Sequence, residues 1–150
     1  MYCPNCRELL SEEQERSRSY CPVCTFPIQA LGGRYKLRRV IAEGGFGVVY
    51  LATDQEDRLH PDRAIKILKP SLFSKPDVFE RFQREIVLTS NLSKETPHIV
   101  HVYPEGGHDK ALGYYYVMEH LKGKSLRELM EKGAVEREKV VTIFSQLCQV

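Results

Sequence analysis

The sequence of 150 residues lacks the features that mark membrane-spanning and exported proteins. Its apolar runs extend over only a few residues, whereas a helix that spans a bilayer needs about 18 or more. The N-terminus also lacks the charged and then apolar layout of a signal peptide. We therefore expect no membrane segment in this chain.

Neither sign of charge dominates the sequence. Lysine and arginine number 22 and the acidic residues 20, which gives a formal net charge of +2. Proteins that bind nucleic acid usually gather basic residues in a patch or stripe, and the segment between Cys6 and Cys21 has three arginines against four glutamates. We expect no nucleic-acid partner.

Four cysteines form two closely spaced pairs near the N-terminus. The pairs Cys3-Pro4-Asn5-Cys6 and Cys21-Pro22-Val23-Cys24 are separated by 14 residues. Each pair can direct two thiolates at one ion, which would complete a tetrahedral zinc site. The alternatives are two disulfides or a redox motif, although a redox C-x-x-C usually lies in a larger βαβ frame. Zinc is the favoured interpretation.

Residues 1–33 are expected to form a small zinc-ribbon-like unit. The segment has few bulky apolar residues, so metal binding would supply its folding free energy. The paired glycines of Leu31-Gly32-Gly33 predict a flexible linker after it. Because metal-type cysteine pairs occur without an export signal, we expect a reducing, cytoplasmic location.

A glycine-rich stretch, Ile41 to Tyr50, is the feature around which the remaining sequence is organised. Three of its four central residues are glycines, and β-branched residues flank them. This composition suits a tight hairpin whose backbone N–H groups approach a phosphate. A lysine, Lys66, then ends the apolar run Ala64-Ile65-Lys66 and would need an anionic partner if buried.

Together these motifs resemble the small lobe of a eukaryotic-type (Hanks-type) serine/threonine protein kinase. Gly44, Gly47 and Val49 match three places of the family's G-x-G-x-x-G-x-V loop, with Ala42 in place of the first glycine. Ala64-Ile65-Lys66 matches the family's A-I-K strand, and Val117 to Leu121 its hinge. The resemblance extends from about Tyr35 to Val150.

The resemblance implies specific roles for individual residues. Lys66 would orient the α and β phosphates of ATP, and Glu85 would pair with Lys66. Met118 would be the gatekeeper of the adenine pocket. The implied nucleotide-contacting set is Ile41, Ala42, Gly44, Gly45, Phe46, Gly47, Val49, Ala64, Lys66, Met118, Glu119 and Leu121.

The expected fold class is α+β. Residues 34–150 would form a five-stranded antiparallel sheet, the αC helix and the first helices of the large lobe, after the zinc ribbon. The apolar spacing predicts the αC helix over Asp77 to Leu92 and strands over Tyr35 to Val40 and Val48 to Thr53. Residues from Asp54 to Arg63 are expected to form an exposed connection.

The end of the sequence predicts a partner surface outside this chain. A last helix presents Val140, Ile143, Phe144 and Leu147 on one face, and Cys148 beside them is expected to be buried. The family's H-R-D and D-F-G motifs, which supply the catalytic base and the Mg²⁺ ligands, do not occur in this sequence.

We therefore interpret the chain as the N-terminal part of a kinase, inactive by itself. When complete, the protein would bind ATP, Mg²⁺ and a protein substrate. The alternatives are a non-catalytic nucleotide-binding scaffold and a zinc-ribbon adaptor.

Overall fold

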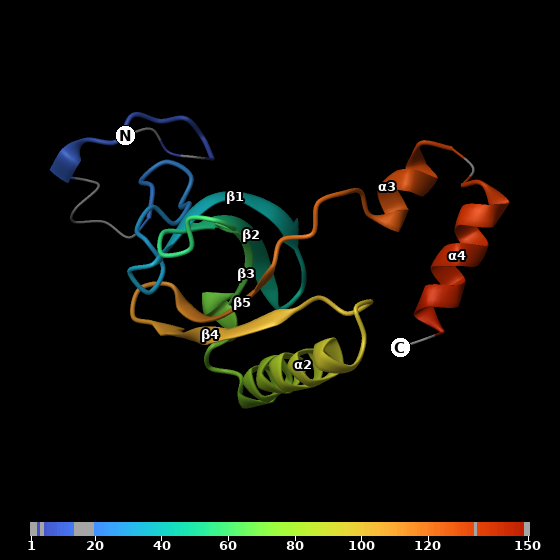
Figure 1. The fold of residues 1–150 in the computed structure, drawn as a ribbon. Helices are drawn as coiled ribbons and strands as arrows, with labels where there is room; N and C mark the ends of the chain where they lie inside the picture. The colour runs from blue at the N-terminus through green and yellow to red at the C-terminus, as the bar shows by residue number, and fades with distance from the viewer. Residues whose placement is uncertain (1–2, 4, 14–19, 134, 149–150) are drawn as a thin grey trace.

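A computed structural model describes residues 3, 5–13, 20–133 and 135–148 (Figure 1). The strands are β1 (Tyr35–Glu43), β2 (Gly47–Asp54), β3 (Asp62–Leu68), β4 (Val102–Asp109) and β5 (Gly113–Glu119). The helices are α2 (Pro76–Glu95), α3 (Leu126–Glu131) and α4 (Arg137–Leu147), with a 3₁₀ turn at Pro70–Leu72. Of the helices in these ranges, none is long and apolar enough to cross a membrane.

The five strands form one antiparallel sheet in the order β1-β2-β3-β5-β4, which confirms the expected fold class. The register places Val49 opposite Lys66 and Lys66 opposite Tyr116. Directly opposed residues share a face of a sheet, so these three side chains lie in one row. The intervening residues, such as Ile65 and Ile67, point to the other face.

Helix α2 covers the face that carries Lys66. It begins with Pro76, a residue type that is well accommodated at the first helical position. Asp77 lies in the first turn, where a negative charge is favourable. Its apolar stripe buries Val78 and Phe82 against the sheet. These two residues share a core with Leu68, Val102 and Tyr116.

The N-terminal segment covers the opposite face of the sheet. Phe26 meets Tyr50 of β2 edge-on at 5.7 Å between ring centroids, and the Tyr20 hydroxyl donates to the Ala111 carbonyl at 2.9 Å. One continuous core joins both parts of the chain: Cys3, Leu10, Cys21, Phe26, Ile28 and Leu31 pack with Tyr35, Leu37, Ala52, Ile65, Ile67, Leu112, Tyr115 and Val117. The sheet is therefore covered on both faces.

The flexible linker expected at Leu31-Gly32-Gly33 is instead a packed turn. Leu31 is fully buried, and its carbonyl accepts the Arg34 and Tyr35 amides at 3.1 and 3.0 Å. Gly32 and Gly33 have φ angles of +58° and +72°, a conformation that glycine adopts without a Cβ penalty. The Gly32 amide also donates to Asp109 at 3.0 Å. The paired glycines serve turn geometry here.

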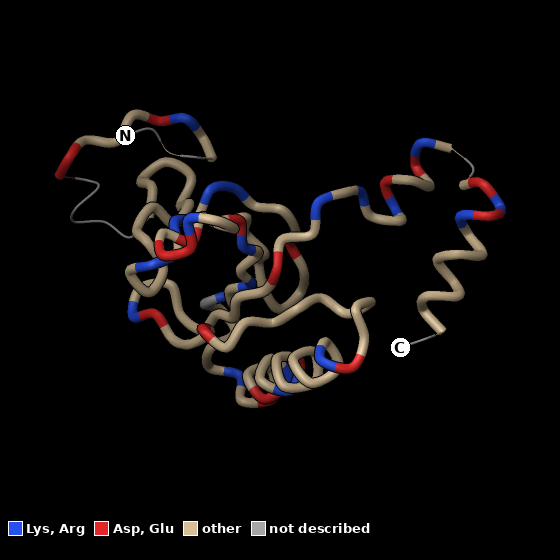
Figure 2. The backbone as a smooth tube through the Cα atoms, viewed as in Figure 1, with Lys and Arg blue, Asp and Glu red and all other residues tan. Residues whose placement is uncertain are grey.

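Helices α3 and α4 extend away from the sheet (Figure 1). Ser125 caps α3 and forms a capping box with Glu128. None of the residues described in α3 and α4 is buried, and the charges of α4 are confined to its first turn (Figure 2). Cys148 is exposed, which corrects the expected buried thiol: Phe144 and Leu147 beside it are exposed too, and the described apolar residues of α4 face only a hollow shared with α3.

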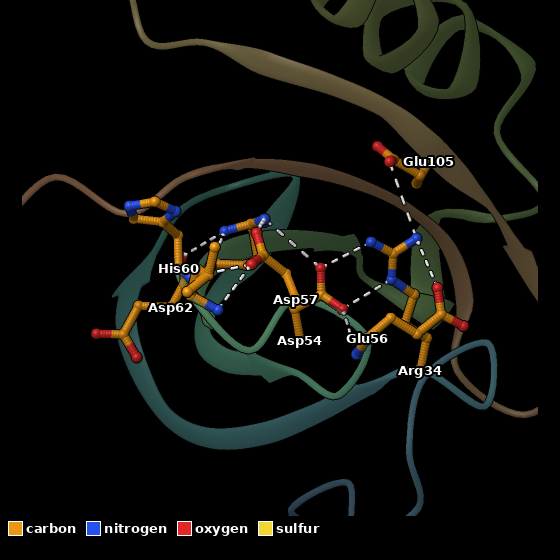
Figure 3. Close-up of polar contacts among 9 residues, drawn as sticks. Arg34, Asp54, Glu56, Asp57, His60, Asp62 and Glu105 are labelled. Atoms are coloured by element: carbon orange, nitrogen blue, oxygen red, sulfur yellow. Dashed lines mark hydrogen bonds and ion pairs between the residues drawn. The ribbon is translucent and has the colours of Figure 1, made fainter.

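A buried ion-pair network closes the end of the sheet opposite the glycine-rich hairpin (Figure 3). Arg34 donates from Nε and Nη2 to the two carboxylate oxygens of Asp54 at 2.7 and 2.8 Å. Arg63 binds Asp57 at 2.7 Å and lies 3.6 Å from Asp54. Asp54 and Arg63 are 1% and 6% exposed, so the expectation of an exposed connection is wrong at both of its ends.

Removing the central carboxylate should destabilise the sheet. In an Asp54→Ala variant Arg34 loses both hydrogen bonds to the buried carboxylate, while Arg63 keeps its pair with Asp57, so the unfolding free energy should fall by about 3 kcal/mol. Asp62→Ala is the control, since its pair with Arg38 is half exposed and contributes about 1 kcal/mol or less. Urea unfolding measures both, and equal losses would contradict the central role of Asp54.

The same carboxylate predicts an acid-dependent loss of stability. The hydrogen bonds from Arg34 hold the pKa of Asp54 below its ordinary value of 3.8. The folded state therefore binds this proton less readily than the unfolded chain, and the stabilisation is complete at neutral pH and lost as pH falls below about 4. Asp54→Ala should flatten that part of the stability curve relative to the unaltered protein.

Candidate nucleotide and metal sites

The glycine-rich hairpin forms a loop between β1 and β2. The Gly44 amide donates to the Gly47 carbonyl at 2.9 Å and closes the turn. The Phe46 carbonyl accepts the Lys69 amide at 3.0 Å, which ties the loop to the end of β3. Gly44, Gly45 and Phe46 are exposed, and the two glycines have no side chain to cover the backbone. The loop backbone is therefore open to a ligand at these glycines.

Gly47 is needed for close packing between strands. A Cβ at this position would lie 2.6 Å from the Ile67 carbonyl oxygen. This clash could be relieved only if β2 and β3 moved apart. At Gly45 a Cβ would meet nothing within 4 Å. The two glycines therefore have different physical roles: Gly47 permits pairing of β2 with β3, and Gly45 leaves the loop tip uncovered.

Lys66 and Glu85 meet between β3 and α2. The Lys66 Nζ atom donates to Glu85 Oε1 at 2.5 Å. The Tyr116 hydroxyl donates to the same oxygen at 2.7 Å. The Lys66 side chain is 19% exposed and that of Glu85 is 40% exposed, so the pair lies at the edge of the core with access to solvent. The structure thus brings together the two residues that the sequence assigned to phosphate positioning.

The other predicted nucleotide contacts lie on the same side of the sheet or next to it. Ala64 is opposite Met118 in the β3–β5 register, while Val49 is opposite Lys66. Leu121 lies beyond β5 and is exposed, and Ile41 and Ala42 lie near the end of β1. Their contact with adenine stays a prediction.

Glu119 is held by the segment before β4. Its carboxylate accepts the His101 amide at 2.8 Å, and its own amide donates to the His101 carbonyl at 2.9 Å. Both interactions use groups other than the Glu119 carbonyl to which the resemblance assigns a hydrogen bond with adenine. The residue is therefore fixed in position without occupying that carbonyl through these two bonds.

The four N-terminal cysteines converge on one point. Their sulfur atoms all lie within 4.8 Å of one another, with Cys3 Sγ 3.6 Å from Cys24 Sγ and Cys6 Sγ 3.7 Å from Cys21 Sγ. In a tetrahedral site with zinc–sulfur bonds of about 2.3 Å, neighbouring sulfurs lie about 3.8 Å apart. A disulfide would require about 2.05 Å. The geometry fits a metal better than it fits either disulfide.

The two cysteine pairs adopt the same type of backbone turn. The Arg7 amide donates to the Cys3 carbonyl at 3.1 Å, and the Thr25 amide donates to the Cys21 carbonyl at 3.0 Å. Arg7 and Thr25 have φ angles of +64° and +56°, which is unfavourable for residues that carry a Cβ. Such conformations persist where surrounding interactions dictate them, and a shared ion would be one such interaction.

Comparison with known proteins establishes the family. Residues 35–150 match the protein kinase domain family, and the chain belongs to it. A probable serine/threonine-protein kinase of Clostridium perfringens is 36% identical over 114 residues, which cover 75% of this chain and 16% of that protein. Serine/threonine-protein kinase PknB of Mycolicibacterium smegmatis is 35% identical over 124 residues, covering 81% of this chain and 19% of that protein.

Solved structures agree on the fold. The kinase domain of Mycobacterium tuberculosis PknI superposes with a TM-score of 0.62 at 22% identity, over 80% of this chain and 46% of that domain. The chain therefore spans about half of a solved kinase domain and less than a quarter of the curated relatives above.

Sequence reasoning missed two features of these sites. The second donor to Glu85, Tyr116, lies among three consecutive tyrosines that read as ordinary core residues of a strand. The positive φ angles of Arg7 and Thr25 leave no mark in residue type, because neither is glycine or asparagine. The equal spacing of each from its cysteine pair was the one available signal, since Arg7 follows Cys6 as Thr25 follows Cys24.

The two glycines of the loop should respond differently to alanine. Gly47→Ala forces a Cβ against a strand backbone and should lower the unfolding free energy by about 1–3 kcal/mol. Gly45→Ala adds its methyl group to open space and should change the unfolding free energy by about 0.5 kcal/mol or less. Denaturant unfolding of both variants tests this, and similar midpoints would show that β2–β3 packing does not require Gly47.

Proposed function

We propose that this chain is the nucleotide-binding part of a protein that transfers the γ-phosphate of ATP to serine or threonine residues of a protein substrate. The observation that carries the proposal is the Lys66–Glu85 pair at 2.5 Å, on the sheet face next to an open glycine-rich loop. Membership in the protein kinase family and similarity to serine/threonine-protein kinases support it.

The proposed chemistry depends on positioning and charge. Loop amides and the Lys66 ammonium would bind the phosphates, while Glu85 keeps that ammonium pointed toward them. Val49, Ala64 and Met118 would contact the base. Mg²⁺, when bound with ATP, neutralises charge on the phosphates, and its protein ligands in this family come from motifs outside this sequence.

Replacing Lys66 should abolish most phosphoryl transfer by the longer protein that carries this chain. Lys66→Met removes the cation that orients the phosphates, so kcat/KM for ATP should fall by a factor of about 10³ or more while the sheet stays folded. Glu85→Gln should be milder, because it loosens the ammonium without removing it. Steady-state phosphorylation of a generic Ser/Thr peptide mixture measures both effects.

The matched control is Lys69→Met. Lys69 follows β3 and pairs with Glu43 at 2.8 Å, outside the Lys66–Glu85 pair. This variant should retain activity within a few-fold of the unaltered enzyme. Normal turnover in Lys66→Met would refute the proposed role. An equal loss in Lys69→Met would also contradict it, because activity would then depend on basic residues in general and not on Lys66.

The second part of the proposal is a structural zinc site at Cys3, Cys6, Cys21 and Cys24. Sulfur–sulfur separations of 3.6 and 3.7 Å and the matched turns of the two pairs support it. Zinc would hold the two turns together and thereby keep Phe26, Ile28 and Leu31 against the sheet. The resulting unit would be a metal-dependent cover of the kinase sheet.

Metal analysis tests this site. Protein purified under reducing conditions should contain about one zinc ion per chain, and Cys6→Ser combined with Cys24→Ser should remove it. Cys148→Ser is the control, since that thiol is exposed in a different part of the chain. Chelation of the zinc should lower the unfolding midpoint of the sheet in the unaltered protein and leave the double variant unaffected. Stoichiometric disulfides without metal would overturn the proposal.

A further inference from the structure

The carboxylate of Glu85 accepts two donors, and only one of them belongs to the expected pair. Lys66 Nζ and the Tyr116 hydroxyl both reach Oε1, at 2.5 and 2.7 Å. Lys66 and Tyr116 are directly opposed in the β3–β5 register. Two neighbouring strands therefore present two hydrogen-bond donors to one oxygen of the helix.

Tyr116 is more firmly fixed than the lysine. It is 4% exposed, and its ring packs on Phe82, one helical turn before Glu85, at 5.4 Å between centroids. Behind it, a Cβ at Gly106 would lie 3.1 Å from the Tyr116 Cα atom, so β4 approaches this residue closely because it has no side chain there. Tyr116 thus contacts α2 at two points from a rigid place in the core.

The phenol is a permanent donor. Burial, together with the neighbouring Glu85 carboxylate, raises the pKa of Tyr116 well above its ordinary value of 10. The hydroxyl therefore stays protonated over the physiological range and donates to the carboxylate. Lysine behaves differently, because its ammonium must also serve the phosphates when nucleotide is bound.

We propose that Tyr116 is a positioning residue that holds Glu85, and with it α2, in the orientation that pairs with Lys66. The role rests on the proposed phosphoryl transfer, in which Glu85 aligns Lys66. An ion pair whose carboxylate is 40% exposed is weakened by salt and by solvent. The phenol of Tyr116 is neutral and buried, so salt screens its hydrogen bond to the same oxygen less than it screens the ammonium, and Tyr116 keeps Glu85 in place before ATP arrives and while Lys66 contacts phosphate.

Tyr116→Phe tests the proposal in the longer protein that carries this chain. The substitution deletes one oxygen and keeps the ring on Phe82. We expect kcat/KM for ATP to fall about ten-fold, as the loss of one hydrogen bond to a charged group implies. We also expect added salt to lower kcat/KM more in this variant than in the unaltered enzyme. Tyr114→Phe is the matched control: its ring also packs on α2, against Phe79 at 4.4 Å, and activity should stay within about two-fold.

A double-mutant cycle separates positioning from core packing. In a Glu85→Ala background the hydroxyl has no carboxylate to bind, so Tyr116→Phe should have no further effect on kcat/KM. An undiminished ten-fold loss in that background would overturn the proposal, because Tyr116 would then act through the core alone. Unchanged activity of the single Tyr116→Phe variant would overturn it as well.

Hydrogen exchange provides a test that does not depend on catalysis. In nucleotide-free protein, Tyr116→Phe should raise exchange about ten-fold at amides of residues 82–89, with β5 unchanged, whereas Tyr114→Phe should not. If the unaltered protein transfers no phosphate, the proposed function fails while this measurement still decides the role of Tyr116. Equal exchange in the two variants would refute it.

Discussion

The two-sided sheet is the constraint on which the rest of the structure depends. Because side chains alternate across a strand, β3 presents Ile65 and Ile67 to one side and Lys66 to the other. Both sides carry apolar residues that need cover. The N-terminal segment covers one side and α2 the other, and this division leaves the Lys66 side next to the glycine-rich loop.

The two covers have different consequences for function. Helix α2 delivers Glu85 to Lys66, so its packing through Phe82 is directly linked to the candidate nucleotide site. The described residues of the N-terminal segment pack on the back of the same strands, against Ile65 and Ile67 and away from Lys66. Its influence on the site must pass through the sheet, whose stability it shares through one continuous core.

Buried charge is concentrated away from the candidate site. Arg34, Asp54 and Arg63 form their network at the end of the sheet where β1 begins, and Tyr103 packs on the Arg63 guanidinium at 4.5 Å. Such networks destabilise a fold when incomplete, so each member needs its partners. The Lys66–Glu85 pair is less enclosed, with side chains 19% and 40% exposed, and is thereby accessible to ligand.

Local periodicity and composition determined the first strands, α2 and the glycine-rich loop. The resemblance to protein kinases added the five-stranded sheet and the pairing of Lys66 with Glu85. The sequence also identified the four cysteines whose sulfurs converge. Only the tertiary structure decided that Gly32 and Gly33 form a packed turn, that Asp54 and Arg63 are buried, and that Tyr116 binds Glu85. These depend on residues far apart in sequence, and residue type does not reveal which of several tyrosines or arginines finds a partner.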